Sequence, residues 1–397
     1  MTRPSSANPA SRRVMGFGET VFSRFTALAQ EHDAINLGQG FPDFEPPDFA
    51  LSALRAAAGG YQQYAPLPGM PTLLAALRAK LAPVLGRELR PARNIQITVG
   101  ATEALFAAMQ ALLDPGDEVV VIEPFYDAYP AAVTMAGGVP RYVPLRPQED
   151  GAWLLDMDEL AAAFGARTKL IIVNSPHNPT GKVFSPGELD AIIALAEGHD
   201  ALIVSDEVYE HIAFEPHLSV AARPGAWERT LTVSSVGKTF SVTGWKIGWA
   251  VGPAPLVHAL RMAHQWIPFA VATPLQVAAA EMLGRAAEEG YYQGLRALYA
   301  RKRDLLLGAL EKTPFRPLAP QGSYFVMADA SALAYEDDIA LCTALPAEAG
   351  VGAIPPSFFY SDAHKGLAKH LVRFAFCKRD EALIEAGERL RSLGERR

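Results

Sequence analysis

The sequence is poor in cysteine. Its 397 residues include two cysteines, Cys342 and Cys377. Two cysteines cannot build a disulfide framework, and their separation does not match the spacing of a metal-ligand pair. We therefore expect neither a disulfide scaffold nor a metal site.

The chain also lacks a block of one charge and a long apolar run. Lys and Arg total 36, Asp and Glu total 43, and the two signs are mixed, with a net charge of −7. No basic stretch or basic amphipathic helix indicates nucleic acid or a membrane surface. No run approaches the ~20 apolar residues of a membrane helix, and residues 1–22 lack the apolar core of a secretory signal. We expect a cytoplasmic protein with no nucleic-acid or membrane partner.

What the chain does have is length and hydrophobic residues. It is roughly two to three times as long as a typical domain, and 50% of its residues are hydrophobic, which predicts a globular protein with a large core. We assign residues 1–50 to an N-terminal arm and part of a small domain, residues 51–285 to a large domain, and residues 286–397 to a small C-terminal domain.

Short β-rich runs alternate with helix-like segments in the middle of the chain. The runs are EVVVIEP (118–124), KLIIVNSP (169–176), ALIVSDEV (201–208), TLTVSS (230–235) and IGWAVG (247–252). Such runs suit strands that are buried on both faces. Between them lie helical patterns such as SPGELDAIIALAEG, with Ser185 as N-cap, Pro186 at N1 and Gly198 as C-cap. The alternation predicts an α/β fold with a mostly parallel sheet covered by helices.

From about residue 286 the pattern changes. A long helical segment, YYQGLRALYARKRDLLLGALEK, leads into strand-like GSYFVMAD (322–329), and LVRFAFCK (371–378) precedes a terminal helix. This predicts a smaller α+β domain, and the first ~50 residues are expected to include a strand that joins it.

Two lysines stand in the apolar stretch SSVGKTFSVTGWKIGW (234–249). Lysine is normally exposed, but the neighbouring aromatic and aliphatic residues belong in an interior. We therefore expect Lys238 and Lys246 to be enclosed and to need a partner or a task.

Polar and aromatic side chains follow several predicted strands. They are Phe125 and Tyr126, then Asn174, His177 and Asn178, then Asp206 and Tyr209, then Ser235 and Lys238. Taken singly, each could be a turn former or a core residue. Because ligands bind at the carboxyl ends of parallel strands, their coincidence there indicates a site for a flat, charged, heteroaromatic cofactor.

From INLGQGFPDF (35–44) to LVRFAFCK (371–378), the chain resembles the class I/II aminotransferases, fold-type I enzymes that use pyridoxal phosphate. TVGATEAL, EPFYDAY, NSPHNPTGKVF, SDEVYE, SSVGKTFSVTGWKIGW and QGSYF occur in the family's order. The sequence is most similar to kynurenine/glutamine and methionine aminotransferases and to bacterial N-succinyldiaminopimelate aminotransferases. The resemblance implies a large domain with a seven-stranded type of sheet and a homodimer with shared active sites.

The resemblance assigns roles around the cofactor ring. Lys238 would carry the cofactor as a Schiff base and would then move the Cα proton. Asp206 would pair with the pyridine nitrogen and keep it protonated. Tyr209 and Asn178 would donate hydrogen bonds to the phenolic oxygen, and Phe125 would stack on the ring.

The resemblance also assigns the phosphate ligands. Ala101 and Thr102 open a helix, and backbone N–H groups at a helix N-terminus bind anions. Ser235 would add a hydroxyl and Lys246 a cation, at a position where many relatives have arginine. Tyr64 would reach the phosphate of the neighbouring subunit, unless it is a core tyrosine of its own chain.

Arg373 matches the residue that binds the substrate's α-carboxylate, assisted by Asn178 and the backbone at Gly40. Three phenylalanines match aromatic positions of the substrate pocket: Phe22, Phe269 and Phe359. Core packing is the alternative for each of them. Aromatic walls favour apolar, sulfur-containing or aromatic substrates, although Ala270 replaces a histidine found in some kynurenine-type relatives.

These assignments predict ping-pong transfer of the α-amino group from an amino acid of the methionine, glutamine or aromatic type to a 2-oxo acid. The alternatives are N-succinyl-LL-2,6-diaminopimelate as substrate and β-elimination from cysteine conjugates. A transcription regulator with an aminotransferase-like body is disfavoured, because about 35 residues before INLGQGF are too few for a DNA-binding module.

Overall fold

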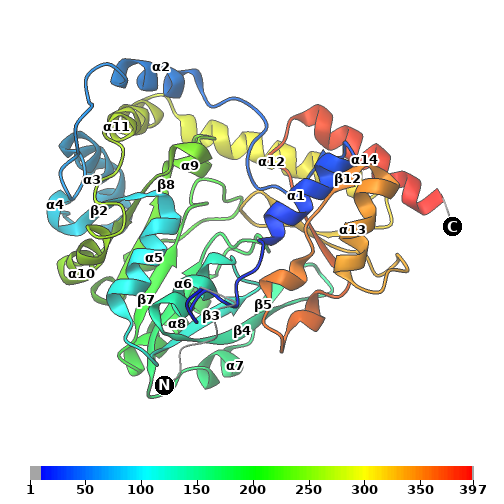
Figure 1. Cartoon of the computed structure of the whole chain (residues 1–397), viewed down its shortest axis with the longest axis horizontal. Coiled ribbons are helices and arrows are strands. Elements are labelled where there is room, and N and C mark those ends of the chain that lie inside the picture. Colours follow the sequence, from blue (N-terminus) through cyan, green and yellow to red (C-terminus); the bar gives the residue numbers. More distant parts are fainter. Residues whose placement is uncertain (1–9, 396–397) are drawn as a thin grey trace.

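The structure is a computed structural model, and it describes residues 10–395. Its larger part is built on an eight-stranded sheet with the order β2-β9-β8-β7-β6-β3-β4-β5 (Figure 1). The strands are β2 (Ile95–Val99), β3 (Glu118–Glu123), β4 (Val139–Pro147), β5 (Trp153–Leu155), β6 (Thr168–Asn174), β7 (Leu202–Asp206), β8 (Thr230–Ser235) and β9 (Ile247–Val251). The mostly parallel α/β sheet expected from the sequence is confirmed.

The centre of this sheet is parallel and buried. Strands β4, β3, β6, β7 and β8 pair in parallel, whereas β9 runs antiparallel to both of its neighbours, β8 and β2. The sheet has one strand more than the seven-stranded type, because the three-residue strand β5 pairs antiparallel with β4. Every residue of β3 and β8 is buried, as expected for strands covered on both faces.

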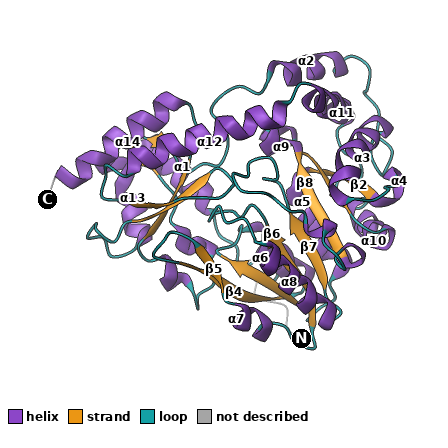
Figure 2. Ribbon diagram, turned by 180° about the vertical axis from the view of Figure 1, so that it is seen from behind, coloured by secondary structure: helices purple, strands orange, loops and turns teal. Residues whose placement is uncertain are grey.

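Helices cover both faces of the sheet (Figures 1 and 2). Residues of α5 (Gly100–Leu112), α6 (Ala128–Ala136) and α10 (Ala254–His264) share one core cluster with Val119 and Val121 of β3. Residues of α7 (Met157–Ala162) and α8 (Pro186–Gly198) share another with Val120 and Ile122, which point to the opposite face. The alternation along β3 thus divides the core into two layers.

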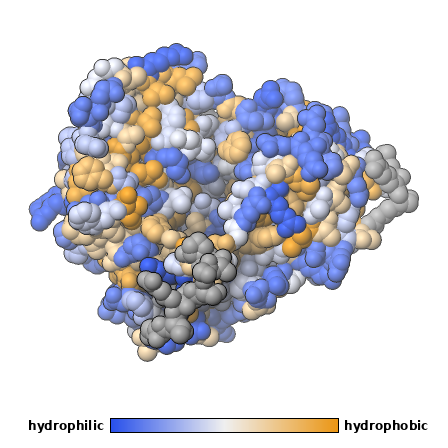
Figure 3. All heavy atoms as spheres, in the orientation of Figure 1, coloured by the Kyte–Doolittle hydropathy of each residue, from blue (hydrophilic) through white to orange (hydrophobic). Residues whose placement is uncertain are grey.

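A further layer covers the β2–β9 edge. It consists of α2 (Asp48–Ala57), α3 (Pro71–Leu85) and α11 (Thr273–Glu288), which pack in one core cluster with residues of β2 and β9. Two short helices, α4 (Pro91–Asn94) and α9 (Val236–Thr239), lead into β2 and follow β8. Hydrophobic residues are also visible on the surface over this part in Figure 3.

Helix α8 shows how local sequence sets an element's ends. Ser185 caps its first turn in a capping box with Glu188, and Pro186 is the first helical residue. The expected C-cap was wrong by one position, because Gly198 is the last helical residue and His199 is the cap. The cap is closed by backbone bonds and does not need a left-handed glycine.

The smaller part contains a three-stranded antiparallel sheet with the order β10-β11-β13. Its elements are α12 (Tyr291–Leu310), β10 (Arg316–Leu318), β11 (Phe325–Asp329), α13 (Asp338–Ala349), β12 (Val351–Gly352), β13 (Leu371–Ala375) and α14 (Asp380–Glu395). The N-terminal segment joins this part: β1 (Ile35–Asn36) pairs in parallel with β12, and α1 (Val21–Glu31) shares its core cluster. Residues 1–9 of the expected arm lie outside the described residues.

Across the described part of the chain, residues 10–395, no helix is both long enough and apolar enough to cross a lipid bilayer.

Candidate active site

A cavity of about 160 Å³ lies where β6, β7 and β8 end and α5 begins. Eight of the residues to which the resemblance assigned a role line it: Ala101, Thr102, Asn178, Asp206, Tyr209, Ser235, Lys238 and Lys246. The parallel strands bring these residues together because their carboxyl ends meet at one edge of the sheet. Gly100, Tyr126, Tyr129 and Asn174 are also in the lining.

The amine of Lys238 lies between two oxygens. Its Nζ donates to the Tyr324 hydroxyl at 2.7 Å and to the Gly40 carbonyl at 3.3 Å. Burial lowers the pKa of Lys238 to about 8, and the positive charge of Lys246 acts in the same direction. At pH 7 about a tenth of this amine is therefore neutral and nucleophilic, far more than of an ordinary lysine.

The carboxylate of Asp206 is buried opposite this amine, in the same cavity. Its Oδ2 accepts a hydrogen bond from the Tyr129 hydroxyl at 2.7 Å, and its Oδ1 accepts one from the Val208 backbone at 3.2 Å. Burial raises the pKa of Asp206 to about 6, although both hydrogen bonds oppose the shift. Such a group would hold a proton shared with a basic ring nitrogen.

The N-terminus of α5 lines one end of the cavity, and backbone N–H groups at such a helix end are suited to an anion. Gly100 has φ +71°, and a Cβ there would lie 3.1 Å from Lys246 Nζ. A Cβ on Gly248 would lie 2.5 Å from the Gly100 carbonyl carbon. Glycine is therefore required where the first residue of α5 packs against β9. Lys246 itself is exposed, so the expectation that it is enclosed was wrong; its backbone at φ +53° turns it to the rim.

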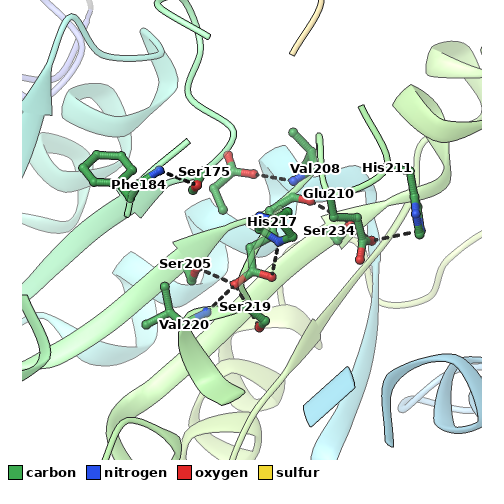
Figure 4. A network of polar contacts seen from close by, with 12 residues as sticks. Ser175, Phe184, Ser205, Val208, Glu210, His211, His217, Ser219, Val220 and Ser234 are labelled. Carbon is green, nitrogen blue, oxygen red and sulfur yellow. Dashed lines mark hydrogen bonds and ion pairs between the residues drawn. The ribbon is translucent and has the colours of Figure 1, made fainter. Parts of the chain in front are cut away.

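Two further carboxylates follow β7 and are not in the cavity lining: Glu207 is buried and Glu210 is partly exposed. Figure 4 shows Glu210 beside Ser234 and His211. Glu207 accepts hydrogen bonds from the hydroxyls of Ser205 and Ser219 at 2.8 and 3.1 Å, and it pairs with His217 Nε2 at 3.2 Å.

Glu210 accepts from the Ser234 hydroxyl at 2.9 Å and from Lys80 Nζ at 2.8 Å. The bonds of Glu207 and Glu210 hold the turn that follows β7, and this turn places Tyr209 in the cavity lining beside Asp206.

Arg373 lies on β13 and is fully buried. Its guanidinium donates to Asn178 Oδ1 at 3.3 Å and to the Gly38 carbonyl at 2.8 Å, and its Nε has no hydrogen-bond partner among the described residues. Three rings surround it, with centroids 4.2 to 5.2 Å from Cζ: Phe22, Phe325 and Phe359. Unused donor capacity on a buried cation suits a carboxylate ligand.

Comparison with known proteins identifies the family. Residues 32–390 match the family described as "Aminotransferase class I and II". The chain belongs to the class I and II aminotransferases. It is 42% identical to kynurenine–oxoglutarate transaminase of Dictyostelium discoideum, covering 96% of both chains, and 42% identical to methionine aminotransferase of Escherichia coli, covering 95% of this chain and 96% of that protein.

The solved structure of N-succinyldiaminopimelate aminotransferase from Mycobacterium tuberculosis superposes with a TM-score of 0.93 at 43% identity, covering 97% of this chain and 100% of that one. The fold is therefore fold type I, and the protein is an aminotransferase enzyme, a transferase of amino groups.

The aminotransferase site differs from the sequence-based expectation at Phe125. That ring is not in the cavity lining; it is buried and packs against Tyr142 with centroids 5.5 Å apart. Tyr126 lines the cavity in its place. The EPFYDAY segment supplies an aromatic face as expected, but the turn into α6 directs the second aromatic residue inward.

Phe269 also lies elsewhere. It is 61% exposed and is not in the cavity lining; its ring contacts Tyr64, which is 80% exposed, with centroids 5.2 Å apart. Tyr64 is therefore not a core tyrosine of its own chain. Phe22 and Phe359, in contrast, contact each other with centroids 5.9 Å apart beside Arg373.

Three residues with polar contacts in the site received no role from the sequence. Tyr129 bonds Asp206, Tyr324 bonds Lys238, and Asn174 Oδ1 accepts from the Asn178 backbone at 2.7 Å. A helical spacing could have indicated Tyr129, which lies three residues after Tyr126 at the start of α6. Tyr324 directly precedes β11 in the smaller part, and only the tertiary structure brings it to Lys238.

Proposed function

We propose that this aminotransferase holds pyridoxal phosphate in the cavity between Lys238, Asp206 and the N-terminus of α5. The main support is that three groups line one cavity: the Lys238 amine with its lowered pKa, the buried Asp206 carboxylate, and the N-terminus of α5 with Lys246 beside it. These groups fit an aldehyde, a pyridine nitrogen and a phosphate. When bound, the cofactor would supply an electron sink for the substrate's Cα.

The remaining cofactor contacts are supplied by this chain's own side chains. Asn178 and Tyr209 would donate hydrogen bonds to the phenolic oxygen, and Tyr126 would offer its ring face. Ala101, Thr102 and Ser235 would donate to the phosphate. Lys238 Nζ, once free, would take the proton from the substrate's Cα, and the Tyr324 hydroxyl and Gly40 carbonyl hold this amine in position.

Arg373 would bind the substrate's α-carboxylate, which places the side chain beside Phe22 and Phe359. These apolar walls favour an amino acid of the methionine, glutamine or aromatic type over a long acidic one. The substrate names of the similar proteins include kynurenine and methionine. N-Succinyl-LL-2,6-diaminopimelate stays the second candidate, because the Mycobacterium tuberculosis enzyme of that name is among the similar structures.

We also propose a homodimer with shared sites. Tyr64 and Phe269 form an exposed aromatic pair outside their own chain's cavity. Trp266, at 84% exposure, lies in the same loop as Phe269. Exposed aromatic rings at neighbouring positions are typical of a protein interface. In such a dimer Tyr64 would reach the neighbour's phosphate. The cytoplasmic location expected from the sequence stays a prediction.

A half-reaction screen tests the function. Protein loaded with pyridoxal phosphate is mixed with single amino acids, N-succinyl-LL-2,6-diaminopimelate included, and the cofactor's visible absorbance is followed. We expect loss of absorbance with methionine, glutamine or phenylalanine and its return on adding a 2-oxo acid. Release of pyruvate from a cysteine conjugate without a 2-oxo acid would favour β-elimination. A protein that stays colourless with the cofactor would contradict the proposal.

A further inference from the structure

Phe359, whose ring lies beside Arg373, belongs to a segment that is hydrogen-bonded to the segment of Phe125 and Tyr126. Phe359 ends the short 3₁₀ helix η4 (Pro356–Phe359), and its carbonyl accepts a bond of 2.7 Å from the Phe125 backbone. Phe125 directly precedes Tyr126, which lines the cavity. The segment that presents Phe359 to the guanidinium is therefore tied to the segment that presents an aromatic ring to the cofactor.

The buried carboxylate of Glu123 makes a second connection between these two segments. Glu123, the last residue of β3, is fully buried. Its Oε1 accepts from the Ser361 backbone, and its Oε2 pairs with His364 Nδ1 at 2.5 Å. Burial raises the pKa of Glu123, and both of these bonds oppose the rise. A buried carboxylate that loses a partner carries a desolvation penalty, so the pairing is maintained.

The segment 361–364 is partly exposed on its outer side. Residues 361–364 line an open cleft of about 700 Å³, together with Arg141, Tyr142 and Phe164. At its other end the segment is anchored by Ser357, whose backbone donates to Asp338 Oδ2 at 2.7 Å. Without the bonds to Glu123, residues 361–364 have room to move into the cleft and to pull on Phe359, two residues before Ser361, and so shift its ring from Arg373.

We propose that Glu123 and His364 are positioning residues that fix Phe359 against Arg373 and so determine how well the enzyme binds substrates with an aromatic side chain. The inference rests on the proposed role of Arg373 as the carboxylate ligand. In this proposal Arg373 binds the substrate's α-carboxylate. Loss of the Glu123–His364 pair therefore weakens the contact between Phe359 and the substrate's side chain, and it leaves the contact between Arg373 and the substrate's carboxylate in place.

The test uses two acids that differ in the phenyl group alone, 3-phenylpropionate and propionate, titrated calorimetrically into the cofactor-loaded protein. His364 is the more exposed partner of the pair, with 25% of its side chain exposed against 0% for Glu123, so it is the first residue to replace. For His364→Ala we expect about fivefold weaker binding of 3-phenylpropionate, the worth of one hydrogen bond, and unchanged binding of propionate. Glu123→Gln should act in the same direction, and His364→Gln, which keeps an N–H donor, should restore most of the affinity.

Asp362→Asn is the matched control, because Asp362 belongs to the same segment but its side chain is fully exposed; both affinities should stay at the wild-type values. Melting temperatures show whether each variant is folded, and His364→Ala suffices if Glu123→Gln does not fold. Equal weakening of both acids, or none in His364→Ala, would overturn the inference. A wild type that transaminates but binds both acids equally would also overturn it, whereas a wild type that does not transaminate contradicts the proposed function.

Discussion

The hydroxyl of Tyr129 donates a 2.7 Å hydrogen bond to Oδ2 of Asp206, and both side chains are at least 96% buried. Tyr129 comes from α6 and Asp206 from the end of β7, so the bond joins a covering helix to the strand that supplies the cavity's carboxylate. The bond lowers the pKa of Asp206 against the rise caused by burial. Tyr129 therefore helps to keep the buried carboxylate ionised and oriented.

Removal of the Tyr129 hydroxyl should weaken cofactor binding without abolishing it. In Tyr129→Phe we expect about a 10-fold loss of pyridoxal phosphate affinity, because a hydrogen bond to a charged group is worth about 1.5–3 kcal/mol. Absorbance titration of the cofactor measures it. Tyr335→Phe is the matched control, since the Tyr335 hydroxyl donates to the exposed carboxylate of Glu348; equal losses in the two variants would contradict a specific role for Tyr129.

The lowered pKa of Lys238 predicts the pH dependence of cofactor uptake. The neutral amine is the reactive form, so uptake by the cofactor-free protein should speed up as pH rises through about 8 and level off above it. An ordinary lysine would continue to gain up to about pH 10.5. Stopped-flow absorbance across this range measures the midpoint.

Lys246→Ala should move that midpoint upward, because the charge of Lys246 lowers the pKa of Lys238. Lys365→Ala removes an exposed lysine from the surface pair with Asp362 and should leave the midpoint unchanged. A midpoint near 10 in the wild type would show that burial does not act on Lys238 as described.

Shared sites can be tested by mixing two inactive chains. Lys238→Ala removes the reactive amine, and Tyr64→Ala removes the exposed phenol that we assign to the neighbour's phosphate. A mixed dimer would have one site with both residues intact, so activity should return to as much as half of the wild-type value per mixed dimer. No recovery after subunit exchange, with mixed dimers verified by mass spectrometry, would place Tyr64 in its own chain's site, and a Tyr64→Ala chain that is fully active alone would place it outside both sites.

The Lys80–Glu210 pair should contribute measurably to stability. Both side chains are 11% exposed. Burial alone would raise the pKa of Glu210, but the charges of Lys80 and His211 outweigh it and lower the pKa to about 2. This stabilisation is therefore present above pH ~4.5, the ordinary value for Glu, and is lost as pH falls toward 2.

Lys80→Met should lower the free energy of unfolding in urea by about 3–5 kcal/mol at neutral pH, because it leaves a buried charge unpaired. The deficit should shrink as pH falls below the pKa of the unpaired Glu210 in the folded variant, which burial raises above its ordinary value, because protonation removes the unpaired charge. Lys365→Met, which breaks an exposed pair with Asp362, should cost at most ~1 kcal/mol. A deficit independent of pH would assign the effect to lost packing.

Much of the site was predictable because strand ends are predictable. The runs before Asn174, Asp206 and Ser235 form β6, β7 and β8, and each of these residues ends its strand. Parallel pairing then brings them together without further information. The positions of Phe125 and Phe269 were not predictable, because the direction of a side chain depends on the turn around it and on what packs there.

The amino-acid sequence by itself determined the fold class, the order of the strands and helices along the chain and the family motifs, because periodicity and capping act over a few residues. The tertiary structure alone decided that Tyr126 faces the cavity, that Tyr324 contacts Lys238 and that Glu123 holds the segment of Phe359. The contacts of Tyr324 and Glu123 join residues 86 or more positions apart in the sequence, and the direction of Tyr126 depends on one backbone turn. The packing of the layers against one another determines which of these side chains meet.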